Sequence, residues 1–428
     1  MSKDSPSPVT MKYGRPMHLT KNQTVQRPQK RRIRLKFKHI YVSFMIGAFI
    51  WICLLTSGLK RLNDTPLHGN DRALHDGPSD TKTEIQTKQK TKPSWCDRII
   101  KARSTLDVGL GITYPCEKLR PAVSAVVVFL TDGVPKDKSD HRVFSSEDYV
   151  KGLLALGMSL RKHMTRDDTH KLLLIREGFT LPPNDLSDLE AVGWTIGTAP
   201  AIDILPRYLP RFPRYKTVYT KLAVIGLSEY KCALLLDADT LVLGSINDFL
   251  SCDVFDRPEY RLAGTIDYYR QRWMHINTGS VLWRTSAEEM NRVYNLTKDK
   301  KFMRKFESDQ IFVNTVYPDR MDKEKNEMLL KSPEAHRDEW GSIVALPWEY
   351  NAQTHVEKEL PEFWNEHLDQ VKILHYTQKK GWQCEERHDG PPPGEAKKCN
   401  AKDPLCACRE GWRWWDDLRE AKKLVGSS

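Results

Sequence analysis

The segment from Leu234 to Ser245 reads LLLDADTLVLGS, so two acidic residues, Asp237 and Asp239, interrupt a run of aliphatic side chains. A short, continuous apolar run is typical of a strand that is buried on both faces. Side chains two residues apart on an extended backbone lie on the same side. Because an unpaired buried charge costs several kcal/mol, the two aspartates need a partner from elsewhere in the chain.

The two carboxylates come directly after the strand-like ALLL. Ligands of open α/β sheets gather beyond the carboxyl ends of the strands. Carboxylate oxygens suit Mg²⁺ or Mn²⁺, which keep open positions for substrate phosphates. We therefore interpret Asp237 and Asp239 as metal ligands, with the small Ala238 leaving room for a bound molecule. An acid pair at a strand end can also cap a turn or face water, so the pair alone leaves these roles open.

The sequence before this strand alternates between strand and helix patterns. SAVVVFL from Ser124 and KLLLIREG from Lys171 are apolar runs, and the helix-like DYVKGLLALGMSLRKH separates them. An acidic loop, then AVGWTIGTAP, and then a second helix-like stretch at 217–230 lead to the strand with the aspartates. Short apolar runs separated by amphipathic helices predict an α/β fold with parallel strands.

Polar groups recur beside other apolar runs downstream. The tripeptide Asn-Thr-Gly at 277–279 precedes a predicted strand, and Asp309-Gln310 opens an amphipathic stretch. In VKILHYTQKKGW, the apolar run ends at His375 and a basic turn with Lys379 and Lys380 follows. An imidazole suits the same cation, and a lysine suits a diphosphate. A turn residue, a helix cap and a structural histidine are the competing roles.

Taken together, these segments resemble glycosyltransferase family 8, the glycogenin-like retaining sugar transferases, from about Ser124 to Trp382. The matching segments, in the family's order, are VVVFLT, DYVKGLLALGMSLRKH, TKLAVIGLSEYKCALLLDADTLVL, INTGSVL, SDQIFVN, LPWEYN and LHYTQKKGW. The resemblance implies a single GT-A-type nucleotide-sugar-binding domain, with a Rossmann-like mixed sheet and helices on both faces. It also implies a nucleotide-sugar donor, expected to be a UDP-sugar, and Mn²⁺ in preference to Mg²⁺.

The resemblance also implies roles for individual residues. Asp237, Asp239 and His375 match metal ligands, and Asp309 and Gln310 match residues beside the anomeric carbon, where the catalytic groups are expected. The positions that match donor-binding residues are Thr131, Tyr149, Lys221, Asp237, Ala238, Asp267, Asn277, Gly279, Lys379 and Lys380. The turn after His375 is shorter than is usual in the family, so the choice between Lys379 and Lys380 stays open. Same-face attack and a covalent intermediate both stay open as routes to retention.

The first 38 residues hold eleven Lys and Arg against one acid, Asp4, and so account for ten of the eleven net positive charges. The uncharged stretch from His39 to Leu59 follows, and about 20 apolar residues cross a bilayer as a helix. A basic flank keeps the amino terminus cytosolic. We predict a single-pass type II protein of the Golgi membrane with its catalytic domain in the lumen. Charge confined to this tail argues against nucleic acid as a partner.

The cysteines fit this topology, because eight of the nine follow the predicted span and disulfides persist in an oxidising lumen. Their connectivity stays open. The predicted organisation is a cytosolic tail (1–38), a transmembrane signal-anchor (39–59), a polar, flexible stem (60–94), a Cys-bracketed lead-in (95–122), a glycosyltransferase domain (123–383) and a Cys- and Trp-rich cap (384–428).

The carboxyl-terminal cap lies beyond the family resemblance. Its four cysteines predict disulfides rather than a zinc site, because Cys406-Ala407-Cys408 lacks the usual ligand spacing. Trp412, Trp414 and Trp415 suit either stacking on acceptor sugars or packing on the main domain, and we favour packing.

The sequence therefore predicts a retaining glycosyltransferase that moves a sugar from a nucleotide-sugar donor to a glycan, protein or lipid acceptor. Glucose, galactose, N-acetylglucosamine and glucuronic acid donors all stay open. The alternative is a catalytically inactive lumenal glycan-binding or scaffolding protein that keeps the fold. The presence together of Asp237, Asp239, His375 and Asp309 argues against that alternative.

Overall fold

The structure of the protein is a computed structural model that describes residues 94–106, 111–131, 144–208, 215–269, 272–303, 308–318, 342–386 and 410–426. All of them fall in one of the two units into which the chain divides, residues 89–428. The predicted tail (1–38), membrane helix (39–59) and stem (60–94), apart from Ser94, lie outside the described residues. Within the ranges given, no helix combines the length and the apolar character that a membrane crossing requires.

A mixed sheet in the described part has the strand order β3-β2-β1-β4-β7-β6-β8. β1, β2, β3 and β4 are parallel, β7 is antiparallel to both β4 and β6, and β8 is parallel to β6. The strands span Ser124–Leu130 (β1), Thr169–Arg176 (β2), Thr195–Ala199 (β3), Cys232–Leu236 (β4), Leu262–Tyr269 (β6), Arg272–Arg284 (β7) and Ile343–Ala345 (β8). The predicted α/β fold with parallel strands is therefore confirmed for this part of the chain.

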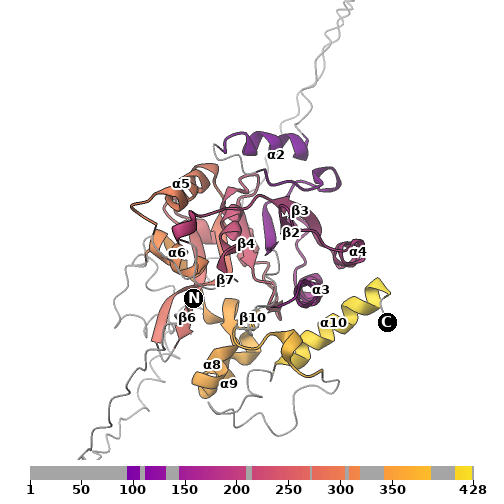
Figure 1. Cartoon of the computed structure of the whole chain (residues 1–428). Helices are drawn as coiled ribbons and strands as arrows, with labels where there is room; N and C mark the ends of the chain where they lie inside the picture. The colour runs from indigo at the N-terminus through magenta and orange to yellow at the C-terminus, as the bar shows by residue number, and fades with distance from the viewer. Residues whose placement is uncertain are drawn as a thin grey trace, which may run out of the picture. The chain divides into compact units, whose positions relative to one another are not determined.

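Helices cover both faces of this sheet, with α3 and α4 on one side and α5 and α6 on the other (Figure 1). In β1, Val126 and Val128 join the apolar cluster that includes α3, whereas Ala125 and Val127 join the cluster of the opposite face. This two-sided burial explains why the strand is apolar without alternation. The helices span Trp95–Arg103 (α2), Ser146–His163 (α3), Pro183–Ala191 (α4), Ala287–Lys298 (α5), Asp309–Val316 (α6), Thr354–Glu359 (α8), Pro361–His367 (α9) and Gly411–Val425 (α10).

A second sheet of three short strands has the order β5-β10-β9. It comprises Thr240–Val242 (β5), Ala352–Gln353 (β9) and Ile373–His375 (β10), and β10 pairs antiparallel with β5. Its register sets His375 opposite Thr240. The small sheet thereby brings a histidine from late in the chain next to the residue that follows Asp239.

Three local predictions were wrong. The acidic loop after β2 contains α4, which starts with Pro183 at its first turn and buries Leu189. The predicted helix at 217–230 is a 3₁₀ helix, η5 (Val218–Gly226), in a segment rich in β-branched residues, which disfavour the α-helix. The tripeptide 277–279 lies within β7 and does not precede it, because β7 begins at Arg272 with residues that pair with β6.

Short 3₁₀ helices connect the larger elements. They span Cys116–Lys118 (η2), Pro206–Tyr208 (η3), Phe249–Ser251 (η6), Asp253–Phe255 (η7), Trp348–Asn351 (η9), Leu368–Gln370 (η10) and Gly381–Gln383 (η11).

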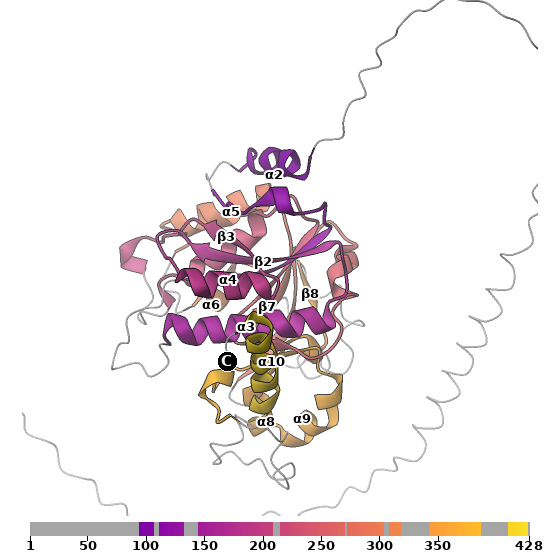
Figure 2. The same cartoon turned by 90° about the vertical axis from the view of Figure 1, so that its right-hand side faces the viewer.

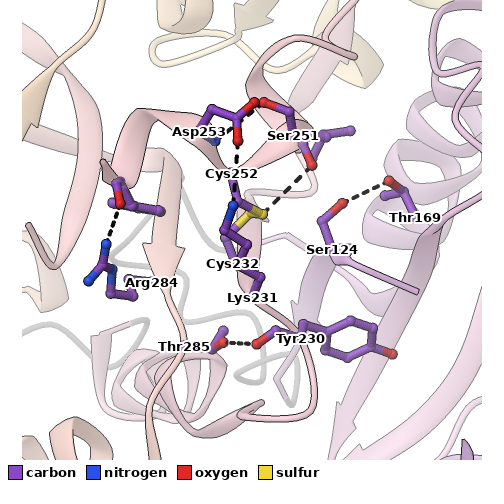
Figure 3. Close-up of a disulfide and its surroundings, with 12 residues drawn as sticks. Ser124, Thr169, Tyr230, Lys231, Cys232, Ser251, Cys252, Asp253, Arg284 and Thr285 are labelled. Carbon is purple, nitrogen blue, oxygen red and sulfur yellow. Dashed lines mark hydrogen bonds and ion pairs between the residues drawn. A yellow bond between two sulfur atoms is a disulfide. The ribbon is translucent and has the colours of Figure 1, made fainter. Parts of the chain in front are cut away.

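Two disulfides join described cysteines. Cys96 in α2 is bonded to Cys116 in η2, and Cys232 at the start of β4 is bonded to Cys252 between η6 and η7 (Figure 3). Cys384 is also disulfide-bonded. The remaining cysteines of the predicted cap lie outside the described residues.

Candidate functional site

The segment 237–239 is fixed on two sides by backbone hydrogen bonds. The N–H of Asp237 donates to the carbonyl of Gly279 in β7 at 2.9 Å, and the N–H of Tyr376 donates to the carbonyl of Asp239 at 3.0 Å. A β-carbon at Gly279 would overlap the imidazole of His375, so glycine allows β7 to approach the histidine. The end of β4 is therefore held between β7 and the residue that follows β10.

This arrangement brings the three predicted metal ligands together. One ligand atom each from Asp237, Asp239 and His375 lies within 4.8 Å of the others. Oδ1 of Asp239 is buried without a hydrogen-bond donor and lies 3.4 Å from Nε2 of His375. A buried carboxylate oxygen without a donor is satisfied by a cation, and two carboxylates with an imidazole are a donor set that divalent ions accept. The residues present therefore fit a divalent metal.

Two asparagines set the orientation of the histidine ring. Nδ2 of Asn351 donates to Oδ1 of Asn277 at 3.0 Å, which turns the carbonyl oxygen of Asn351 toward Nδ1 of His375, at 3.1 Å. Nδ1 therefore carries the proton, and Nε2 presents its lone pair to the aspartates. This is the tautomer that a metal-binding histidine requires.

Two lysines neutralise the acids. Nζ of Lys221 lies 2.6 Å from Oδ1 of Asp237 and 3.9 Å from Oδ2 of Asp309, and Lys380 forms an ion pair with Asp239. Burial lowers the pKa of Lys221, but Asp237 and Asp309 outweigh burial and raise it above its ordinary value. Burial raises the pKa of Asp239, yet Lys380 holds it well below its usual range. Lys221 and Asp239 therefore stay charged although both are buried.

A second group of polar residues lies at the start of α6. Oγ1 of Thr278 donates to Oδ2 of Asp309 at 3.3 Å, and the N–H of Thr278 donates to Oε1 of Gln310 at 3.3 Å. Nε2 of Gln310 donates to Oδ2 of Asp267 at 2.8 Å. Burial raises the pKa of Asp309, with Lys221 opposing the rise. Asp309 is thus a buried carboxyl group beside the acid pair.

These groups line one cavity of about 650 Å³. The predicted site residues that line it are Tyr149, Lys221, Asp237, Asp239, Asn277, Gly279, Asp309, Gln310, His375, Lys379 and Lys380. Three others do not line it. Ala238 is buried in the apolar cluster that includes α3, Asp267 reaches the site through Gln310, and Thr131 follows the end of β1. The expected room beside Ala238 is therefore filled by packing.

Aromatic side chains form part of the cavity wall. Phe144 and Tyr149 line it, and the ring of Trp382 packs against both, with centroids 5.4 and 5.7 Å away. Trp382 is therefore a packing residue. Tyr149 is buried, which raises the pKa of its phenol, and Asp239 raises it further.

Sequence reasoning did not single out Asn351 or Thr278. Asn351 lies in LPWEYN, which was quoted for the family resemblance, and Thr278 lies between two chosen residues. Neither has a local signal, because each acts through contacts with residues that are distant in sequence.

Comparison with known proteins identifies sequence relatives, one named a glucuronosyltransferase and one named glycogenin-1. The chain is 27% identical to inositol phosphorylceramide glucuronosyltransferase 1 of Arabidopsis thaliana over 174 residues, which is 40% of this chain and 29% of that protein. It is 24% identical to glycogenin-1 of Mus musculus over 288 residues, covering 64% of this chain and 72% of the mouse protein. The chain thus spans under a third of the plant relative. No family model matches the sequence.

Among solved structures, the glycosyltransferase GlyE of Streptococcus pneumoniae matches with a TM-score of 0.40 and 16% identity, over 70% of this chain and 63% of that one. The sequence relatives support a glycosyltransferase, in agreement with the resemblance seen in the motifs.

Proposed function

We propose that this protein is a retaining glycosyltransferase that takes a sugar from a nucleotide-sugar donor, a UDP-sugar, in a reaction that depends on Mn²⁺. The observation that carries the proposal is the meeting of Asp237, Asp239 and His375 with Lys221 and Lys380 around one cavity. Acids with an imidazole suit a divalent cation, and the lysines add positive charge where a diphosphate binds.

The bond that breaks joins the sugar to the diphosphate, so negative charge grows on the leaving phosphate. A bound divalent ion would supply Lewis-acid stabilisation of that charge. Lys380 adds a fixed positive charge on the same side, since its ammonium group lies at Asp239. Asn351 keeps the ring of His375 oriented. Together these residues favour departure of the diphosphate.

The sugar becomes positively charged as the bond breaks. Asp309 offers a carboxylate for that charge, and Thr278 and Lys221 hold it in place. Gln310 is held between Thr278 and Asp267, which fixes its amide at the same end of the cavity. We assign Asp309 and Gln310 to the sugar end and Lys380 to the diphosphate end, with Lys221 between Asp237 and Asp309.

The proposed setting is the lumen of the Golgi, with the chain anchored by residues 39–59 and a glycan, protein or lipid as acceptor. The two disulfides of the described part support an oxidising compartment.

The test is UDP release by the purified full chain from a panel of UDP-glucose, UDP-galactose, UDP-N-acetylglucosamine and UDP-glucuronic acid. We expect release from one donor with Mn²⁺, loss of release with EDTA, and loss in Asp239→Ala. UDP binding without turnover of any donor, with or without candidate acceptors, would instead support the inactive glycan-binding alternative. Turnover that EDTA and Asp239→Ala leave unchanged would contradict the metal site.

A further inference from the structure

The carboxyl-terminal helix α10 packs directly against the turn that follows β10. The ring of Trp414 is fully buried against Gly381, where a β-carbon would overlap it. The hydroxyl of Tyr376 donates to the carbonyl of Glu410 at 2.9 Å, just before α10. The close approach at Gly381 means that the position of the turn depends on the position of this one ring.

Further contacts hold the two ends of this turn. Nε1 of Trp415 donates to the carbonyl of Cys384 at 3.0 Å. The ring of Trp382 lies 6.1 Å from that of Trp414 and also packs on Tyr149 of α3. Gly152 of α3 lies close to the same indole, so Trp382 is enclosed between α3 and α10. The turn is therefore fixed by rings on two helices.

The helix itself is anchored on α3, across which it lies (Figure 2). Nζ of Lys162 lies 2.5 Å from Oδ1 of Asp417 and 2.8 Å from Oε2 of Glu420. Leu418 adds a fully buried apolar contact one turn after Trp414. α3 also packs against β5, which begins just after the acid pair. α3 thus contacts both α10, which holds the turn after β10, and β5, which follows the two aspartates.

The turn carries two of the lysines that line the cavity, Lys379 and Lys380. Thr377, Gln378, Lys379, Lys380 and Gln383 all line the cavity. The N–H of Lys380 donates to Oε1 of Gln383 at 2.9 Å, and its Nζ donates to the carbonyl of Tyr376 at 2.9 Å. The direction of the Lys380 side chain is therefore set by the shape of the turn.

We propose that Trp414 is a positioning residue for the donor diphosphate, and that α10, outside the region of family resemblance, completes the donor site. The inference rests on the proposed function for the identity of the ligand. Fixed charges stabilise a ligand more than mobile ones because no reorganisation is needed on binding. A smaller side chain at 414 would leave the Gly381 backbone unsupported and let the lysines move.

A purely structural role for α10 makes a different prediction. Any loss of buried apolar contact on the helix would then lower stability and leave donor binding alone. Leu418→Ala is the matched control, because Leu418 is buried in the same helix and is not among the residues that line the cavity.

The experiment measures UDP binding to the purified full chain with Mn²⁺ by calorimetry, and steady-state UDP release. We expect Trp414→Phe to raise the dissociation constant of UDP and the donor KM about tenfold, with little change in kcat. Leu418→Ala should lower the melting temperature and leave the dissociation constant within about twofold of wild type.

A second-site variant tests the contact itself. Gly381→Ala should weaken UDP binding because its methyl group displaces the turn, and adding Trp414→Leu should recover part of the loss by making room. Normal UDP binding by folded Trp414→Phe and Gly381→Ala would overturn the inference. So would an equal weakening by Leu418→Ala.

Hydrogen exchange of residues 376–384 separates this inference from the proposed function. Wild-type protein that does not bind UDP would refute the donor assignment. The positioning claim would still predict faster exchange of this turn in Trp414→Phe than in Leu418→Ala. Equal exchange rates in the two variants would overturn it whatever the ligand is.

Discussion

The two ends of β4 differ in how their polar groups are satisfied. At its first residue, the Cys232–Cys252 disulfide ties the strand to the chain that follows, and Ser124 bonds to Thr169 at 2.8 Å on the neighbouring strands (Figure 3). Beyond its last residue, Oδ1 of Asp239 is buried without a hydrogen-bond donor. The first end is stabilised by a disulfide and a hydrogen bond between buried hydroxyls. The other end keeps a buried carboxylate oxygen that a bound cation can satisfy.

This difference follows from the direction of the strands. β1, β2 and β4 are parallel, so their carboxyl ends meet at one edge, where the loops that follow bring side chains together. The amino ends of these strands lie at the opposite edge of the sheet, where no predicted site residue lies. We therefore expect substitutions at the carboxyl end to alter activity and substitutions at the amino end to alter stability.

Asp239→Asn should give the largest effect and test the functional end. The amide keeps the size of the side chain but removes the charge that faces His375 and Lys380, so we expect kcat/KM to fall about 10³-fold. Steady-state UDP release measures it, with circular dichroism as the control for folding. Activity near that of wild type would contradict the claim that the carboxyl end of β4 serves activity.

Removing the Cys232–Cys252 disulfide should give the next largest effect, on stability. The bond closes a loop with a sequence separation of 20. Chain entropy predicts that its removal lowers the free energy of unfolding by about 3 kcal/mol. Urea unfolding of the protein with Cys232→Ala and Cys252→Ala measures this loss. The Cys96–Cys116 pair has the same separation and is the matched comparison. A fall in kcat of the folded variant would show that the two ends are not independent.

Asp309→Asn should lower activity about 10²-fold and yet raise stability at neutral pH. Burial raises the pKa of Asp309 in the folded protein, so its protonated form favours folding. That contribution is complete below the pKa of the unfolded chain, near the ordinary value of 3.8, and is lost as pH rises through the folded pKa. The gain of the amide variant should therefore grow with pH.

Thermal unfolding of wild type and Asp309→Asn across pH 4 to 8 checks this sign. A variant that is less stable than wild type at pH 7 would show that the ion pair with Lys221 outweighs the burial of the carboxylate. The functional end would then contribute to stability, contrary to the comparison.

Ser124→Ala should give the smallest effect, a loss of about 1–2 kcal/mol, because Thr169 would keep a buried hydroxyl without its partner. UDP release should be unchanged. The double variant Ser124→Ala, Thr169→Val removes both hydroxyls and should recover most of the loss. Denaturant unfolding of Ser124→Ala, Thr169→Val and the double variant forms a double-mutant cycle with wild type, and strictly additive losses would contradict the predicted coupling.

Much of the fold could be predicted because its central strands carry a strong local pattern. SAVVVFL coincides with β1, and the predicted helix from Asp148 falls within α3. The segment that became α4 was read as a loop because its acids masked Leu186 and Leu189, three positions apart on the helix. The tripeptide 277–279 was misplaced because the part of β7 that precedes it is formed by pairing with β6, which the local pattern does not show.

The candidate site was predictable where its residues end apolar runs, as Asp237, Asp239 and His375 do. Asn351 was missed because its role comes from contacts with Asn277 and the histidine ring. The packing of Trp414 was favoured, and its burial confirms it. Its place against Gly381 had no signal in either segment alone.

By itself, the sequence determined that a buried strand ends in two acids, since apolar runs and alternation are local properties of the chain. Only the tertiary structure decided which groups meet those acids. Lys380 reaches Asp239 from 141 positions away, and the pairing of β10 with β5 puts His375 beside it. A charge buried at a strand end requires a partner. The pairing of β10 with β5 and the packing of α10 on the turn determine that the partners are His375 and Lys380.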